Sequence, residues 1–317
     1  MTSPFDTLRL PVFAAPMFLV SGPEMVVAAC RAGIGGAFPT TNCRTVEEVD
    51  GWMDQITGSL RPGDGPWICN LITHSTNARL AEDLRLVAQY KPPVVITALG
   101  SPRPVMETVK AYGGLVFADV ISMKLAKKAA EAGVDGLACV SAGAGGHTGH
   151  LSPFAFISAV RDSFDGYVAV GGGIGDGAGV AGAIAAGADF VYMGTRFLAT
   201  TESMAQPAYK QMVIDAGADD LVISDSVTGT PASWLRPSLI AAGQDPDNLA
   251  PPKARDYSSA GDAKRWRDIW AAGQGLDAVR AVEPIGEVVD QLEREYRAAV
   301  ARFIARSGGT GSLRGAA

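Results

Sequence analysis

The sequence predicts an α/β protein, a (β/α)8 or TIM barrel with an inserted, mostly helical C-terminal subdomain. Short apolar runs alternate with helical patterns at intervals of about 20 to 30 residues, as repeated βα units require. Several of these runs are apolar throughout, which is typical of parallel strands covered on both faces. The strands that we expect are 12–16, 35–38, 67–72, 94–99, 115–120, 136–140, 167–172 and 189–194.

The number of strands separates a closed barrel from its main alternative, an open doubly wound sheet. Eight strands in strict alternation with helices fit a barrel of about 250 residues. Glycine-rich junctions also recur where strands end, and in a barrel those ends form one rim that carries the active site. We therefore prefer the barrel. The helices expected between the strands are 23–32, 45–58, 76–90, 103–112, 122–132, 153–163 and 177–187.

The pattern changes after residue 200. Helical stretches at 203–217 and 262–272 flank a loop at 230–261 that is rich in Pro, Asp and Ser. A long amphipathic helix at 284–306 follows, and it could be the eighth barrel helix, reached after an insertion. The expected organisation is a barrel over 1–200, an inserted helical and loop subdomain over 201–283, a returning helix over 284–306 and a disordered tail over 307–317.

Composition excludes several classes of partner. The 317 residues carry a formal net charge of −6 and form no Lys/Arg-rich block, so the basic surface of a nucleic-acid-binding protein is absent. No apolar stretch approaches the roughly 20 residues that a membrane helix needs. The four cysteines lie far apart without a CxxC pair, as expected of reduced, buried thiols. We expect a cytoplasmic protein that binds neither nucleic acid nor membrane.

Two glycine-rich stretches at neighbouring strands predict a phosphate site. GGGIGDG at 171–177 follows the seventh strand, and MGTRF at 193–197 follows the eighth. The loops at these places in a barrel commonly bind phosphate through backbone N–H groups. The alternative is simple turn chemistry. The expected phosphate ligands are Gly172, Gly173, Gly194 and Thr195.

A third glycine pattern is not expected to bind a nucleotide. GAGVAG at 177–182 matches the spacing of a dinucleotide-binding fingerprint. That fingerprint must follow a strand directly and open the helix. Here the glycines fall within the helical stretch, so we interpret them as small residues that allow close packing.

In combination and order, several motifs resemble the nitronate monooxygenase family, formerly 2-nitropropane dioxygenases, which are FMN-dependent TIM barrels. They are APM at 15–17, CNL at 69–71, the GGHTG loop, GGGI, MGTRF followed by TES, and WAAGQG at 270–275. The resemblance implies bound FMN, contacted by Met17, Asn70, Lys124, Gly145 and Gly146 in addition to the phosphate ligands. A cation at Lys124 would stabilise an anionic flavin, although a solvated lysine in a first helical turn is the alternative.

The resemblance also implies that His147, in SAGAGGHTGH at 141–150, is the active-site base or orients the substrate. An imidazole that titrates near pH 6.5 suits a base at neutral pH. We assign His74 and His150 only a weaker claim to substrate binding, and a surface position is the alternative for His150. No metal site is expected, because an H-x-x-H pair in a glycine loop lacks the usual helical scaffold.

The expected reaction is the oxidation of alkyl nitronates with O2 to a carbonyl compound and nitrite. The same superfamily includes flavin-type enoyl-acyl-carrier-protein reductases and quinone reductases, so the alternative is an NAD(P)H-dependent reductase of an enoyl thioester, enone or quinone. A barrel that binds a flavin or phosphate metabolite without redox chemistry is the non-catalytic alternative. The substrate is a small molecule, and we expect a monomer or homodimer. Trp234, Tyr257 and Trp270 are expected to pack within the subdomain rather than to line a pocket.

Overall fold

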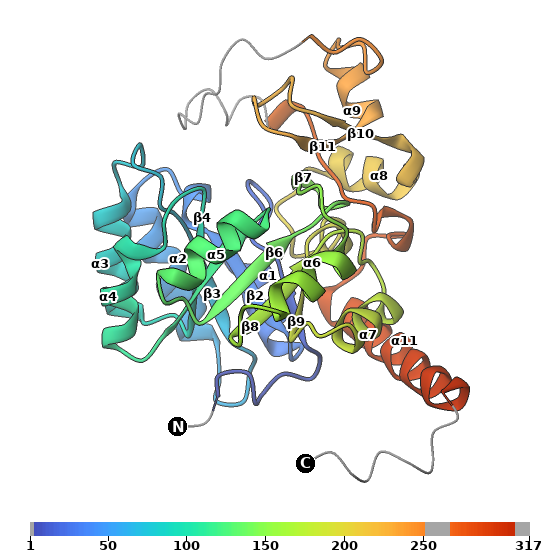
Figure 1. The fold of residues 1–317 in the computed structure, drawn as a ribbon. Coiled ribbons are helices and arrows are strands. Elements are labelled where there is room, and N and C mark those ends of the chain that lie inside the picture. The colour runs from blue at the N-terminus through green and yellow to red at the C-terminus, as the bar shows by residue number, and fades with distance from the viewer. Residues whose placement is uncertain (1–2, 251–266, 308–317) are drawn as a thin grey trace.

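The computed structural model describes residues 3–250 and 267–307, and it shows eight parallel strands closed into a barrel (Figure 1). Each strand pairs with its neighbours in the order β1-β2-β3-β4-β5-β6-β8-β9, and β9 pairs with β1. This closure confirms the predicted fold class. The barrel strands are β1 (Val12–Ala14), β2 (Gly35–Pro39), β3 (Trp67–Ile72), β4 (Val94–Ala98), β5 (Leu115–Val120), β6 (Gly136–Val140), β8 (Tyr167–Gly171) and β9 (Phe190–Met193).

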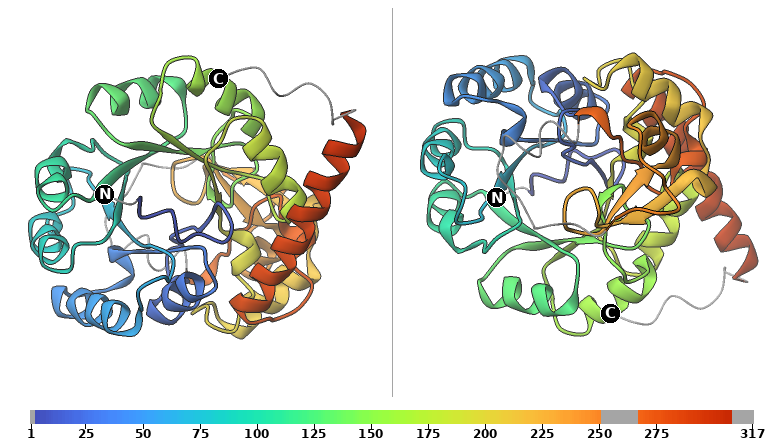
Figure 2. Two further views of the ribbon diagram at one scale, coloured as in Figure 1. Left: turned by 90° about the horizontal axis from the view of Figure 1, so that it is seen from below. Right: turned by 90° about the horizontal axis from the view of Figure 1, so that it is seen from above.

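A ring of helices covers the outside of the barrel (Figure 2). Side chains before several helices cap them; Thr45, for example, accepts a hydrogen bond from the Glu48 N–H at 3.2 Å. The eighth place in the ring belongs to α11 (Ile285–Arg306), which packs against α7 and α1. The other helices of the ring are α1 (Pro23–Arg31), α2 (Val46–Ser59), α3 (Leu80–Tyr90), α4 (Arg103–Ala111), α5 (Met123–Glu131), α6 (Pro153–Arg161) and α7 (Gly177–Ala185).

The inside of the barrel is filled mainly by aromatic and aliphatic side chains. Phe13, Phe117 and Phe190 point inward from three strands, and Phe13 and Phe190 stack with ring centroids 4.5 Å apart. Phe5, from the segment before β1, inserts its ring among them, with its centroid 4.5 Å from that of Phe190. Since β-strand side chains alternate, the next inward positions along these strands lie closer to the C-terminal rim.

The glycines of GAGVAG pack helices together, as the sequence indicates. Gly177 begins α7 at the crossing with α11, and a Cβ there would lie 2.1 Å from the Leu292 carbonyl oxygen. Its N–H donates to Glu295 Oε2 at 2.9 Å. The position of α11 in the ring therefore depends on residue 177 being a glycine, which has no side chain.

We expect Gly177→Ala to lower the free energy of unfolding by about 1–3 kcal/mol, because α11 must move away from α7. Gly286→Ala in α11 is the matched control, since a Cβ at Gly286 meets nothing within 4 Å. Chemical denaturation monitored by circular dichroism measures both variants. Equal stability of the two would contradict the packing role.

The chain after β9 contains a small sheet that the sequence analysis did not predict. The range 230–261 was expected to be loop, but it includes β11 (Ala232–Leu235) and α9 (Arg236–Ala241). β11 pairs antiparallel with β10 (Leu221–Ser224), while α8 (Pro207–Asp215) lies within the predicted helix at 203–217. The subdomain is therefore less helical than expected. Residues 262–266 of the predicted helix, Tyr257 and the tail beyond Ser307 lie outside the described residues.

The third strand of this sheet comes from the barrel. β7 (Gly146–His147), in the loop after β6, pairs antiparallel with β11, so that Ala232 lies opposite His147. Figure 1 shows β10, β11 and α9 beyond the end of the barrel, next to β7. Trp234 is fully buried in this sheet, and Trp270 stacks on Tyr209 with centroids 5.1 Å apart. These two aromatic residues pack within the subdomain, as expected.

Two further sequence expectations bear on the described residues. All four cysteines are free and buried, and burial raises the pKa of the Cys30 thiol to about 12. Within residues 3–250 and 267–307, no helix is both long and apolar enough to cross a membrane.

Candidate active site

Four segments meet at the C-terminal rim of the barrel: the loops after β6, β8 and β9, and the segment 270–275. The Gly143 carbonyl accepts hydrogen bonds from the N–H groups of Gly173, at 3.0 Å, and Gln274, at 2.9 Å. The Gly273 N–H donates to Thr195 Oγ1 at 2.8 Å. WAAGQG, distant in the sequence, thus completes the rim between the predicted phosphate loops and the histidine loop.

The glycines of these segments are required by backbone packing. A Cβ at Gly273 would lie 2.5 Å from the Gly143 carbonyl oxygen, and one at Gly145 would lie 2.7 Å from the Gly273 nitrogen. Gly172 has a φ of +134°, and a Cβ there would lie 2.6 Å from the Ala142 carbonyl oxygen. The glycines of SAGAGG therefore serve first to let the loops pack together.

The predicted phosphate ligands lie together at the ends of β8 and β9. Gly172 and Gly173 both adopt positive φ values. Gly194 lies beside Met17, and a Cβ at Gly194 would be 3.4 Å from the methionine sulfur. The Gly173 N–H is engaged by Gly143, so it joins two loops here. Thr195 Oγ1 accepts from Gly273, which leaves its own hydroxyl proton available for donation.

The arginine of MGTRF does not take part in this cluster. Arg196 is 3% exposed, and its guanidinium donates to Gln291 Oε1 at 2.9 Å and to Glu283 Oε2 at 3.3 Å. It therefore ties the short 3₁₀ helix Thr195–Phe197 to α11 and to the segment before it.

His147 is held by both the barrel and the subdomain. Its backbone pairs with β11, and the following Thr148 donates its N–H to the Pro231 carbonyl at 3.1 Å and its hydroxyl to the Ser141 carbonyl at 3.2 Å. The residue as a whole is half-buried while Nε2 of its ring is buried, and burial lowers the pKa of His147 below its usual value of 6.5. The imidazole is therefore neutral at pH 7 and able to accept a proton.

The remaining predicted side chains are spread around the rim. His150 and Lys124 are exposed. His74 is half-buried after β3, with its Nδ1 2.8 Å from Thr76 Oγ1. Within the described ranges, no three His, Cys, Asp or Glu residues gather as metal ligands. The structure places His74 and His150 on loops after different strands, and it does not join them to His147 as one cluster.

Three polar side chains face inward just below the rim. Asn70 on β3 is buried, and its Nδ2 donates to the Ile96 carbonyl at 3.2 Å. Asp119 on β5 and Tyr192 on β9 continue the inward faces of Phe117 and Phe190. Asp119, Tyr192 and Gln274 were not among the residues predicted from the sequence. A lone carboxylate at an inward position of the apolar run LVFADV was the available signal for Asp119.

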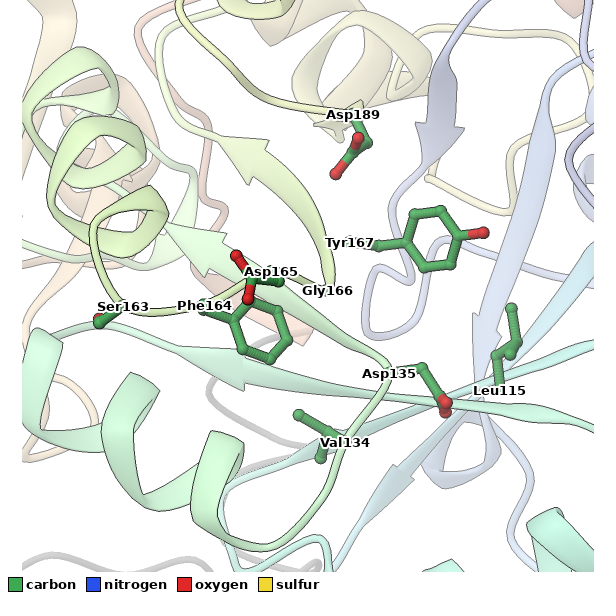
Figure 3. Close-up of a pocket in the computed structure, with 9 residues that line it drawn as sticks. All are labelled: Leu115, Val134, Asp135, Ser163, Phe164, Asp165, Gly166, Tyr167 and Asp189. Carbon is green, nitrogen blue, oxygen red and sulfur yellow. The ribbon is translucent and has the colours of Figure 1, made fainter.

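A surface hollow of about 600 Å³ lies at the opposite end of the barrel, where strands begin (Figure 3). Its Asp135 and Asp189 have structural partners. Asp135 pairs with Lys110 and accepts the Val116 N–H at 2.6 Å, while Asp189 pairs with Arg161. These carboxylates fix the starts of strands, and active sites of barrel enzymes lie at the other end.

A protein-family model described as nitronate monooxygenase matches residues 67–295, from the start of β3 into α11. The match covers more than half of the chain. The chain belongs to the nitronate monooxygenase family. The matched span includes Asn70, Lys124, His147 and the two predicted phosphate loops, while Met17 precedes it.

Two relatives within this comparison cover different shares of the chain. The nitronate monooxygenase of Paraburkholderia phytofirmans is 28% identical over an alignment of 344 positions, gaps included, that covers 92% of this chain and 93% of the relative. The (3aS,4S,5R,7aS)-5-hydroxy-7a-methyl-1-oxo-octahydro-1H-indene-4-carboxyl-CoA dehydrogenase of Rhodococcus jostii is 30% identical over 239 residues. That match covers 75% of this chain and 66% of the dehydrogenase, so this nitronate monooxygenase family member spans just under two thirds of that relative's length.

The fold of this family member is also shared with solved structures. The nitroalkane oxidase of Streptomyces ansochromogenes superposes with a TM-score of 0.81 at 24% identity, covering 95% of this chain and 100% of that one. At this level of identity the similarity shows the barrel fold. The two relatives and the Streptomyces protein are all named for oxidoreductase activities.

Proposed function

We propose that this member of the nitronate monooxygenase family is an FMN-dependent oxidoreductase that oxidises alkyl nitronates with O2 to a carbonyl compound and nitrite. The observation that carries the proposal is His147, a half-buried histidine with a lowered pKa at the C-terminal rim. The glycine loops beside it are suited to a phosphate-bearing cofactor.

The residues at the rim fit FMN. Gly172 and Gly173 adopt positive φ values in a turn without side chains, which lets an anion approach the backbone, and the Thr195 hydroxyl retains a proton to donate. The Met17 side chain lies beside Gly194, where an added Cβ would meet it at 3.4 Å. We assign the FMN phosphate to Gly172, Gly173, Gly194 and Thr195. Gly173 lines this site without donating a hydrogen bond, because its N–H is bonded to Gly143. We assign the isoalloxazine ring to Met17, Asn70, Lys124, Gly145 and Gly146.

FMN, when bound, accepts electrons from the substrate and passes them to O2. The chain's own part is acid–base chemistry and orientation. His147 accepts the α-proton of a neutral nitroalkane, or holds a nitronate that is already ionised. Its backbone, paired with β11, keeps the ring at the rim, so the subdomain positions the base. His74 and His150 are proposed only as outer substrate contacts.

Two measurements test this proposal in order. Purified protein, reconstituted with FMN, should show the visible flavin spectrum; no spectrum after reconstitution would refute the flavin assignment. Under anaerobic conditions, propyl nitronate should then bleach the flavin without NAD(P)H, and nitrite should appear when O2 is admitted. Bleaching that requires NAD(P)H would overturn the oxygenase and favour the reductase.

The second candidate is an NAD(P)H-dependent reductase of an enoyl thioester, enone or quinone. The similarity to a carboxyl-CoA dehydrogenase favours a thioester. Leu99, Ile121 and Leu125, which follow β4 and β5, are also exposed and offer apolar surface to a larger acyl group. Reoxidation of NAD(P)H-reduced enzyme by an enone or quinone would support it. Cytoplasmic location, a monomer or homodimer, and the domain limits stay predictions.

A further inference from the structure

Asp119 occupies the last inward-facing position of β5. Leu115 and Phe117, four and two residues earlier, pack in the barrel interior, whereas Val116, Ala118 and Val120 pack outward against the helices. By the alternation of strand side chains, Asp119 faces inward one step nearer the rim than Phe117. The carboxyl group therefore lies between the apolar interior and the rim that carries the candidate site.

The Asp119 carboxyl is only partly satisfied. The Tyr192 hydroxyl, on β9, lies close enough to it to favour the ionised form of the carboxyl. A Cβ at Gly171, on the strand between β6 and β9, would lie 2.6 Å from the Tyr192 carbonyl oxygen, so the glycine lets these two strands lie close together. One carboxyl oxygen, Oδ1, is buried and has no hydrogen-bond partner within the described residues. Buried polar atoms are nearly always paired, so this oxygen can form a further hydrogen bond with a group that reaches it.

The surroundings of Asp119 favour its neutral form. Tyr192 and Cys139, on β9 and β6, are the titratable groups coupled to it, and neither can carry a positive charge. Burial raises the pKa of Asp119 to about 7, and the Tyr192 hydroxyl opposes part of that rise. A carboxyl that keeps its proton has an O–H to donate, whereas an ionised one only accepts.

We propose that Asp119 binds the ring of the cofactor as a neutral hydrogen-bond donor, so that FMN binding takes up a proton at this carboxyl. This inference rests on the proposed function, because it takes the ligand at the rim to be FMN. A flavin ring offers carbonyl oxygens as acceptors. Covering the carboxyl and supplying an acceptor both stabilise the protonated form, so the bound protein holds this proton more tightly than the free protein does.

The direction of the pH effect follows from linkage. Above neutral pH the free protein must first protonate Asp119 in order to bind FMN, so the Kd rises with pH. With half-protonation near pH 7 in the free protein and full protonation in the complex, the Asp119 contribution weakens binding about tenfold between pH 6 and pH 8.

The test is a titration of FMN into apoprotein, followed by quenching of flavin fluorescence from pH 6 to pH 8 at constant ionic strength. Asp119→Asn keeps the shape and the donor but does not titrate. The ratio of wild-type to Asp119→Asn Kd should rise about tenfold over this range. The FMN phosphate and His147 titrate in both proteins, so their effects cancel in the ratio. Asp165→Asn, an exposed aspartate at the opposite end of the barrel, should behave as wild type.

A second measurement protects the test against a variant that does not fold. Calorimetry of FMN binding to the wild-type protein at pH 8, in two buffers with different ionisation enthalpies, should show proton uptake. Tyr192→Phe, which removes the hydroxyl that favours the ionised form, should move the midpoint of the pH dependence upward.

Three results would overturn the inference. A constant Kd ratio would show that Asp119 does not titrate on binding, and a ratio that falls as pH rises would show that the carboxylate binds as an acceptor. Both leave the proposed function intact, because FMN still binds. If neither protein binds FMN at any pH, the proposed function fails and the inference fails with it.

Discussion

Replacing His147 by alanine is expected to lower kcat/KM for a neutral nitroalkane by about 10²–10⁴-fold, the usual contribution of a general base. FMN should stay bound, because the strand that carries the residue is held by backbone pairing with β11. Burial lowers the pKa of His147, so the neutral, active imidazole should persist below pH 6.5. The pH profile of the wild-type kcat/KM should therefore fall only at still lower pH.

Two controls make this result specific. An alkyl nitronate has already lost its proton, so the His147→Ala enzyme should retain much more of its activity with that substrate than with the nitroalkane. His150→Ala, three residues along the same loop and exposed, should change either rate by less than about threefold if it lies outside the chemistry. Unchanged nitroalkane turnover after loss of the His147 side chain would remove its assignment as base.

Gly172→Ala is expected to have the second largest effect, on cofactor binding. Its φ of +134° is strained for any side chain, and the new Cβ would lie 2.6 Å from the Ala142 carbonyl oxygen and 3.0 Å from that of Ser141. Both neighbours are backbone atoms, so the loops after β6 and β8 must separate. We expect FMN affinity to fall at least about tenfold and unfolding free energy to fall by about 1–3 kcal/mol.

Gly51→Ala in α2 is the matched control for this glycine. A Cβ at Gly51 meets nothing within 4 Å, and alanine in an exposed helix is more stable than glycine by up to about 1 kcal/mol. Thermal unfolding and FMN titration of both variants measure the difference. Wild-type affinity in Gly172→Ala protein would show that this turn does not shape the cofactor site.

The barrel could be predicted because each of its strands is evident within a few residues of sequence. The run WICNLI is apolar because helices cover one face and the interior fills the other, and β3 spans 67–72 as predicted. The small sheet has no such local signal. β10 and β11 contain four residues each, and β7, the second partner of β11, comes from a loop about 85 residues before β11. Such pairing depends on closure of the barrel, which no local window reports.

The candidate site also contains some features that the sequence predicted and others that it could not predict. Resemblance indicated His147 and the glycine loops, and the spacing of strands placed the loops on neighbouring strands. Neither the resemblance nor the spacing showed that the Gly143 carbonyl would accept from both Gly173 and Gln274. Neither showed that Asp119 and Tyr192 would lie close together inside the barrel. Those groups are polar and come from separate segments, so no periodicity links them.

By itself the sequence determined the closed barrel, its membership in an FMN-type family and the residue types available at its rim. Periodicity and motif order are properties of neighbouring residues, so they can be read along the chain. The tertiary structure alone decided that His147 is part of the subdomain sheet and that 270–275 completes the rim. It also decided that one oxygen of Asp119 is left without a partner among the described residues. These contacts join segments that only the folded barrel brings within bonding distance.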